Sequence, residues 1–357
     1  MGKHSASIGI FFQSYLWVTL VCLAIIPRLH SRIFTSSNGT EVDGEVFEVD
    51  GHRVGLRVNE RDYYFSISRF VREDQAYMQK WSAVERCSSC KGKVGTGFRE
   101  AGDDKYHTRC FRCLACRKSF VGGDGLGKGP WGGLVHLEHT SLALSCDSCS
   151  RFFRREDALP KQSFGDGRVH CRVCLEDGVF EGTKVSQVQA RILPVLKRVG
   201  MDLPTKPIHI ELVGRSFLDR EAKRIKAEGK LRGLTLTKFK LTRGTPSSAS
   251  FEHRIYVLSG LPYVECIAVL AHEYAHVWLN ERFIDSTPPE IEGFCNLISE
   301  ICLGQDKSKV SLLLRENMMK SENPVYGAGF RRMRSRLKSL GWDGLFAEML
   351  SKSSPPR

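Results

Sequence analysis

Twelve cysteine and histidine residues stand between positions 87 and 174 in six pairs, and two residues separate the members of each pair. This spacing lets two side chains of one tight turn reach the same ion, and twelve ligands suffice for three tetrahedral zinc sites. A disulfide framework would not need histidines in the same register, so we favour metal. The predicted sites are Cys87, Cys90, His107 and Cys110; Cys113, Cys116, His136 and His139; and Cys146, Cys149, Cys171 and Cys174.

Four protein ligands close each of these sites, which predicts structural rather than catalytic zinc. Segments this short have little other core, so zinc is expected to supply most of their folding free energy. His170 adjoins Cys171 and is a rival ligand for the third site, although Cys171 and Cys174 keep the two-residue spacing.

The order Cys-x2-Cys, His-x2-Cys-Phe-Arg-Cys-x2-Cys over residues 87–116 resembles a LIM domain. We expect that domain at residues 86–140 and a second, zinc-ribbon-like module at residues 141–180. His136 and His139 stand where cysteine or aspartate is frequent in LIM domains. The resemblance implies a platform that binds protein partners.

A different metal pattern lies on an apolar predicted helix around residues 269–279, where His272 and His276 are four residues apart. This spacing places both imidazoles on one helix face, within reach of one ion. Glu273 can hold a water on the open metal position and take its proton. The pattern therefore predicts a catalytic zinc site, and its chance recurrence in an ordinary helix is the alternative.

The third ligand is expected from a helix that begins at Thr287 and Pro288. Glu290 is predicted to close a capping box with Thr287. Glu292, sixteen residues after His276 and followed by small and apolar residues, is then our choice of third ligand. Alternatively, both glutamates are solvated charges that the helix dipole favours.

Motifs around this helix, together with the upstream cysteine region, resemble a peptidase family over residues 86–340. That family comprises the LIM-containing peptidases that control organ size in plants and are activated by ubiquitin. The resemblance implies a zinc endopeptidase with His272, His276 and Glu292 as ligands and Glu273 as base. No ubiquitin-interacting helices are recognisable ahead of the LIM region, so regulation by ubiquitin does not follow. The motifs are Arg232-Gly-Leu234, Ser259-Gly-Leu-Pro262, Glu292-Gly-x-Cys295 and Asn323-Pro-x-Tyr326-Gly-x-Gly-Phe330.

Residues 181–352 are predicted to form an α+β domain of the zincin type. A helix should open it, because apolar residues from Val185 to Val199 recur at helical spacing. Strands are expected at residues 207–213, 233–239 and 254–258, and we hypothesise that the last pairs with an extended substrate. Tyr326 could donate a hydrogen bond to the tetrahedral oxyanion, although a packing role is favoured.

Residues 8–26 carry no charged side chain. As a helix they would span about 28 Å, close to a bilayer core of roughly 30 Å. We expect residues 1–31 to be an uncleaved single-pass anchor, because no small-x-small cleavage site follows the apolar run. A cleaved signal or a soluble buried helix are the alternatives. The flanking charges favour a cytoplasmic location for the bulk of the chain.

Alternating apolar and polar residues in positions 32–81 predict short antiparallel strands that form a small β-barrel. The segment resembles the Sla-type homology domain, a Src-homology-3-like barrel, which implies a protein-binding module. The residues that carry this resemblance are Phe34–Gly39, Val54–Val58, Ser68-Arg69-Phe70 and Asp74–Tyr77.

The net charge is +13, and basic residues cluster between positions 315 and 338. Such a cluster suits nucleic acid or an anionic membrane, but a solvated helix face is the favoured interpretation. The prediction is thus a multidomain α+β, membrane-anchored zinc endopeptidase with one catalytic and three structural Zn²⁺ ions. It would cleave protein substrates and bind protein partners through its LIM and barrel modules. The alternatives are a non-catalytic zinc-module scaffold and, less favoured, a zinc-finger nucleic-acid binder.

Overall fold

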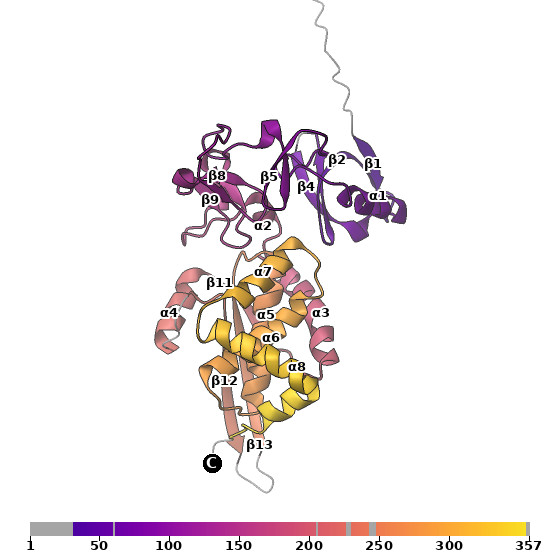
Figure 1. Ribbon diagram of the computed structural model, residues 1–357. Helices are drawn as coiled ribbons and strands as arrows, with labels where there is room; N and C mark the ends of the chain where they lie inside the picture. The colour runs from indigo at the N-terminus through magenta and orange to yellow at the C-terminus, as the bar shows by residue number, and fades with distance from the viewer. Residues whose placement is uncertain (1–30, 60, 205, 226–229, 243–247, 355–357) are drawn as a thin grey trace, which may run out of the picture.

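The computed structural model describes residues 31–354 apart from residues 60, 205, 226–229 and 243–247. The predicted membrane segment, residues 8–26, lies outside the described residues. In the described part of the chain no helix is both long and apolar enough to cross a bilayer. The protein is a mixed α/β, multidomain molecule, with an N-terminal sheet, a middle region of short hairpins and a C-terminal α/β unit (Figure 1).

The N-terminal unit is an antiparallel sheet whose strands follow one another in sequence order. The expected antiparallel strands are present, and the alternation places Phe34, Val54 and Leu56 in a small core. Asp74 ties the following helix to the first strand, because its carboxylate accepts the Thr35 N–H at 2.7 Å. Closure into a barrel remains a prediction. The elements are β1 (Arg32–Thr35), β2 (Glu41–Asp50), β3 (Arg53–Val58), β4 (Arg61–Ser66) and α1 (Arg72–Ser82).

The middle region consists of three two-stranded hairpins joined by turns and short 3-10 helices. One small apolar cluster there is formed by Cys87, Ala101, Tyr106 and Leu134. So few buried side chains give little hydrophobic stabilisation, in keeping with modules that depend on metal. The elements are β5 (Phe98–Ala101), β6 (Asp104–His107), β7 (Leu126–Lys128), β8 (Leu134–His136), β9 (Ala143–Ser145), β10 (Phe152–Arg154) and α2 (Arg172–Glu176).

The C-terminal unit packs helices against a three-stranded sheet and contains the largest hydrophobic core. Helix α5 is buried on nearly every face, with Ile267, Leu270 and Trp278 inside the core, and α6 packs along it. The elements are α3 (Gly182–Arg198), β11 (His209–Val213), α4 (Arg215–Ile225), β12 (Gly233–Thr242), β13 (Ser248–Leu258), α5 (Tyr263–Glu281), α6 (Pro288–Leu303), α7 (Lys309–Lys320) and α8 (Tyr326–Leu350).

The strand order of this sheet is β11-β13-β12. Strand β13 pairs in parallel with β11 and antiparallel with β12, so both of its edges are occupied. The hypothesis that residues 254–258 pair with an extended substrate is therefore wrong. Among the strands that the structure describes, the edge next to α5 belongs to β12.

The turn between β2 and β3 packs on the start of α7 and joins the first unit to the last. The Asp50 carboxylate accepts the backbone N–H of Lys309, and His52 Nδ1 lies 3.0 Å from the Asp306 carboxylate. Gly51 at the turn has a φ of +60°, and a Cβ there would lie 2.4 Å from the Ser308 nitrogen. Glycine is therefore required both for the turn and for the close contact.

Candidate metal centres and their cavity

Two imidazoles and one carboxylate converge between α5 and α6. The Nε2 atoms of His272 and His276 lie 3.2 Å apart, as expected for residues one turn apart on one helix face. Glu292, from α6, places its Oε2 atom 3.1 Å from His272 Nε2 and 3.7 Å from His276 Nε2. The structure thus brings together the three residues that the sequence predicts as catalytic zinc ligands.

The donor set at this point fits a zinc ion. Two histidines and one carboxylate, with a further position open, form a common catalytic zinc site. Burial raises the pKa of Glu292, but hydrogen bonds from His272 and His276 outweigh it and hold that pKa below its ordinary value. The carboxylate is therefore ionised at neutral pH, which is the form that a cation binds.

Cys295 is a further donor that sequence reasoning did not select. It lies one turn after Glu292 and is fully buried, and its sulfur is within 4.8 Å of ring nitrogens of His272 and His276. The signal was present in the Glu-Gly-x-Cys motif, since an i, i+3 spacing places both side chains on one face of α6. The geometry therefore offers a thiol beside the carboxylate.

Glu290, two residues before Glu292, has a different role from the one predicted. Thr287 precedes α6 as expected but makes no side-chain capping bond. The Glu290 carboxylate instead accepts from Lys352 Nζ at 2.7 Å. The capping-box prediction is wrong, because a distant lysine supplies a charged donor that backbone N–H groups do not match.

Asn296 orients the first histidine of the pair. Its Oδ1 atom lies 3.1 Å from His272 Nδ1, which leaves Nε2 directed at the metal position. Its Nδ2 atom donates to the carbonyl oxygen of Tyr326 at 3.1 Å. Partners of this kind fix the ring and its tautomer and strengthen metal binding. Asn296 therefore connects the histidine to the start of α8.

Glu273, the predicted base, faces the first residues of β12. Thr235 Oγ1 lies 2.7 Å from Glu273 Oε2 and 3.1 Å from its backbone oxygen. A Cβ on Gly233 would lie 2.4 Å from Glu273 Oε1 and 2.7 Å from Val269 Cγ1. The glycine therefore lets the edge strand approach the carboxylate closely.

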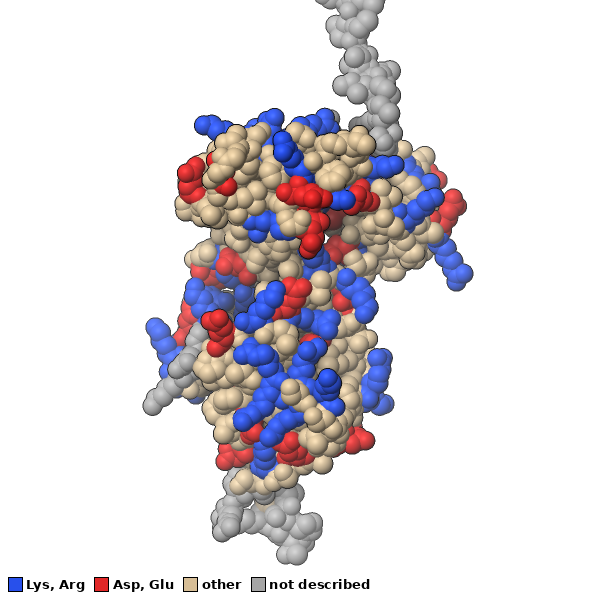
Figure 2. All heavy atoms as spheres, viewed as in Figure 1, with Lys and Arg blue, Asp and Glu red and all other residues tan. Residues whose placement is uncertain are grey.

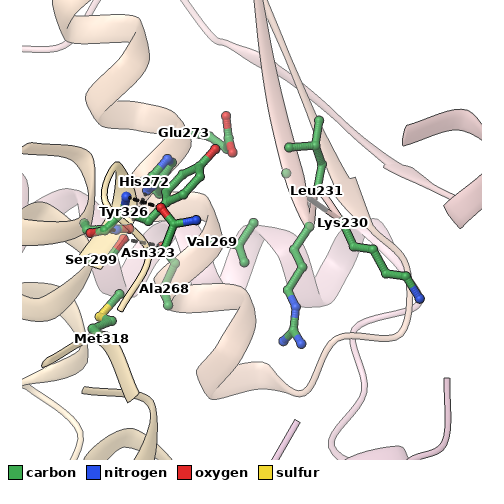
Figure 3. Close-up of a pocket in the computed structure, with 13 residues that line it drawn as sticks. Lys230, Leu231, Ala268, Val269, His272, Glu273, Ser299, Met318, Asn323 and Tyr326 are labelled. Atoms are coloured by element: carbon green, nitrogen blue, oxygen red, sulfur yellow. Dashed lines mark hydrogen bonds between the residues drawn. The ribbon is translucent and has the colours of Figure 1, made fainter. Parts of the chain in front are cut away.

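A cavity of about 510 Å³ opens beside these groups. Figure 3 shows His272, Glu273 and Tyr326 on one side of it and Lys230 and Leu231 on the other. The predicted oxyanion donor Tyr326 thus lines the same cavity as the predicted base. The volume is within the range of sites that hold small ligands or several residues of a peptide.

Each of the three cysteine-rich clusters brings its four predicted ligand atoms within 4.8 Å of one another. In the first, Cys90 Sγ lies 3.3 Å from His107 Nδ1, while the other ring nitrogen lies 3.0 Å from the Lys93 carbonyl oxygen. In the third, the sulfurs of Cys149 and Cys171 lie 3.7 Å apart. This separation fits two thiolates on one tetrahedral zinc ion, because zinc–sulfur bonds are about 2.3 Å long.

The second cluster contains the two histidines that depart from the common LIM pattern. His136 Nδ1 lies 3.5 Å from Cys116 Sγ, and its Nε2 atom lies 3.2 Å from the Asp124 carboxylate. His139 Nδ1 lies 3.6 Å from Cys113 Sγ. The carboxylate on the far side of the His136 ring is the arrangement that typically orients a histidine ligand.

His170, the rival ligand of the third cluster, is placed elsewhere. It is buried, with Nε2 3.2 Å from the Ser148 hydroxyl. The fourfold cluster instead contains Cys171. Together, the three clusters indicate zinc binding.

The middle region contains a LIM domain, because the LIM domain family model matches residues 87–128. Among curated proteins, the chain is 27% identical over 263 residues to the LIM domain-containing protein HDR3 of Oryza sativa subsp. japonica, which covers 61% of this chain and 50% of that protein. It is 20% identical over 352 residues to Protein DA1 of Arabidopsis thaliana, with 71% and 65% covered. The chain thus spans between half and two thirds of the length of these relatives. No solved structure matches.

Proposed function

We propose that this protein is a zinc-dependent endopeptidase whose LIM and N-terminal modules bind protein partners. The observation that carries the proposal is the convergence of His272, His276 and Glu292. Of these three, His272 lines a cavity of about 510 Å³, and Glu273 lines the same cavity. The motifs shared with the LIM-containing peptidases support the same activity.

The catalytic roles follow from the chemistry of each residue. His272, His276 and Glu292 would hold Zn²⁺, which when bound lowers the pKa of a coordinated water and polarises a carbonyl group. Glu273 would take a proton from the attacking water and deliver it to the amide nitrogen as the C–N bond breaks. Thr235 holds the Glu273 carboxylate in place during both transfers.

Substrate binding is proposed at β12. This strand starts beside Glu273, and one of its edges has no partner strand in the described part of the chain. An extended peptide could pair with that edge through backbone hydrogen bonds, which would bring an amide group to the metal position. This replaces the role that the sequence suggested for residues 254–258.

The decisive variant is Glu273→Gln, which keeps the shape of the side chain and removes its basicity. We expect it to retain zinc and the fold but to cleave a proteome-derived peptide library at least about 100-fold more slowly than wild type. Glu316→Gln on α7, where the side chain is half-exposed and pairs with Lys320 of the same helix, is the matched control. Full activity of the Glu273→Gln protein would refute the assignment.

The first alternative, a non-catalytic scaffold, is favoured by the LIM domain itself, because LIM domains generally mediate protein–protein contacts. Metal content separates it from the peptidase: elemental analysis of the purified chain should give four zinc ions for the peptidase and three for a scaffold. A result of three would leave partner binding as the function.

The second alternative, nucleic-acid binding, draws on the basic residues that gather over α7 and α8 (Figure 2). Several of them are already paired: Arg315 and Arg334 lie near Glu300, and Arg336 near Glu290. Such pairing supports a solvated helix face. Salt-dependent binding to DNA or RNA would instead favour this alternative.

Membrane attachment through residues 8–26 is a further proposal, which depends on the apolar sequence alone. Deletion of residues 1–30 should move the protein from the membrane to the soluble fraction of lysed cells. An unchanged distribution would count against an anchor.

A further inference from the structure

A second cavity, of about 120 Å³, lies between the second zinc module (residues 141–180), which contains the third cluster, and the C-terminal unit. Cavities of this size hold several water-sized groups, enough for one anionic side-chain head and its hydration. Four cationic side chains and two carboxylates line it: Arg168, Arg215, Lys230 and Arg232, with Asp147 and Asp166.

The carboxylates do not satisfy the cations. Asp166 is held by Arg168, at 2.9 Å from its Nη2 atom, yet Arg168 Nη1 is buried and has no hydrogen-bond partner. The Asp147 carboxylate accepts the backbone N–H of Val169. Lys230 has no ion pair with any residue in the described ranges.

The surroundings of Arg232 disfavour its positive charge. It contacts the buried Glu265, which neutralises it in part. Burial lowers the pKa of Arg232, and the positive charges of Arg215 and Arg168 lower it further. A site in which like charges oppose one another gains stability when an anion enters.

This cationic cavity adjoins the 510 Å³ cavity beside α5. Lys230 and Arg232 line both cavities, and Gly233, which follows at once, starts the edge strand beside Glu273. A peptide paired with β12 would therefore pass the cationic cavity within a few residues of the scissile bond.

We propose that this cavity is a specificity subsite that binds an anionic side chain, a carboxylate or a phosphate, of a peptide substrate. Lys230 and Arg232 come from the C-terminal unit, and Arg168 comes from the second zinc module. The subsite rests on the proposed function, and it gives the zinc module a part in substrate choice, because that module builds one of the walls.

Binding is tested with full-length, zinc-loaded protein that carries Glu273→Gln, so that the peptide survives. The probes are three fluorescein-labelled decapeptides that share one Gly/Ser/Ala sequence. Their three central residues are all Glu in the first, all phosphoserine in the second and all Gln in the third. Anisotropy should show that a Glu or a phosphoserine peptide binds at least about 10-fold tighter than the Gln peptide, as hydrogen bonds to charged groups would give. Whichever of the Glu and phosphoserine peptides binds more tightly identifies the preferred anion as a carboxylate or a phosphate.

The variants Lys230→Glu and Arg232→Gln should remove this preference. Lys338→Glu, an exposed lysine on α8 outside both cavities, carries the same change in charge and should keep it. Equal binding of all three peptides, or a preference that survives Lys230→Glu, would overturn the inference.

Cleavage by wild-type protein separates the subsite from the activity. In a proteome-derived peptide library, acidic residues should be enriched several-fold at one fixed distance from the cleaved bond, and Lys230→Glu should abolish that enrichment. Cleavage without acidic enrichment refutes the subsite and leaves the peptidase. Preferential binding of acidic peptides without any cleavage refutes the peptidase activity and leaves the anion-binding site.

Discussion

Replacement of Gly233 by alanine tests the position of the predicted base without altering a charged group. The added Cβ would lie 2.4 Å from Glu273 Oε1, where an ordinary contact is at least 3.4 Å, so the carboxylate must move by about 1 Å. A displacement of that size at a reacting group costs about 100-fold in rate, or about 2.7 kcal/mol in the activation barrier. The same Cβ would meet Val269 at 2.7 Å, for which we expect about 1–2 kcal/mol of lost stability.

The assay compares wild type, Gly233→Ala and Gly182→Ala for peptide cleavage, zinc content and thermal unfolding. Gly182 begins α3 and has no atom within 4 Å of an added Cβ, so its variant should behave like wild type. Zinc content should stay constant in all three, because no metal ligand is touched. Wild-type cleavage by Gly233→Ala would refute the view that this strand positions Glu273.

Three further perturbations address the metal sites and the contact between units. A chelator should unfold residues 87–174, seen as a loss of amide protection in hydrogen exchange; unchanged protection would contradict zinc-dependent folding. Asn296→Ala should weaken zinc binding by about 10- to 100-fold in a competition titration, because His272 loses the partner of its Nδ1 atom, whereas Asn317→Ala on α7 should not. Burial raises the pKa of Asp306, but hydrogen bonds from His52 and Ser308 hold it below its ordinary value. Its contribution to stability is therefore complete above about pH 4 and falls as the pH drops further, so the melting difference between wild type and Asp306→Asn should shrink in that range.

The ligand pairs could be predicted from the sequence because their geometry is local. Cys87 and Cys90 share one turn, and His272 and His276 share one helix face, so spacing alone places each pair on a single ion. The LIM prediction is confirmed by the family match at residues 87–128. Glu292 could also be predicted from local features, because the helix start and the short sequence distance from His276 limit the candidate third ligands.

Partners that are distant in the sequence could not be predicted in this way. The sequence around Glu290 gives no indication that Lys352, 62 residues later, donates to its carboxylate. Similarly, no periodicity links His52 to Asp306. The cationic cavity is of the same kind, since Arg168 and Lys230 come from different units. Each of these contacts depends on how distant segments pack together, and residue spacing does not predict that packing.

The order of strands in the C-terminal sheet shows the same limit and has a functional consequence. Residues 233–239 and 254–258 both alternate as half-buried strands, so the sequence does not distinguish the central strand from the edge strand. The position is decided by β11, which joins the sheet in parallel on the far side of β13. Because β13 then has a neighbour on each side, a substrate strand can add to the described sheet only at the outer edge of β11 or of β12. Of these two strands, β12 is the one that contacts Glu273 through Thr235. A proline in place of Leu236 in β12 should thus impair peptide binding more than a proline at His209 in β11.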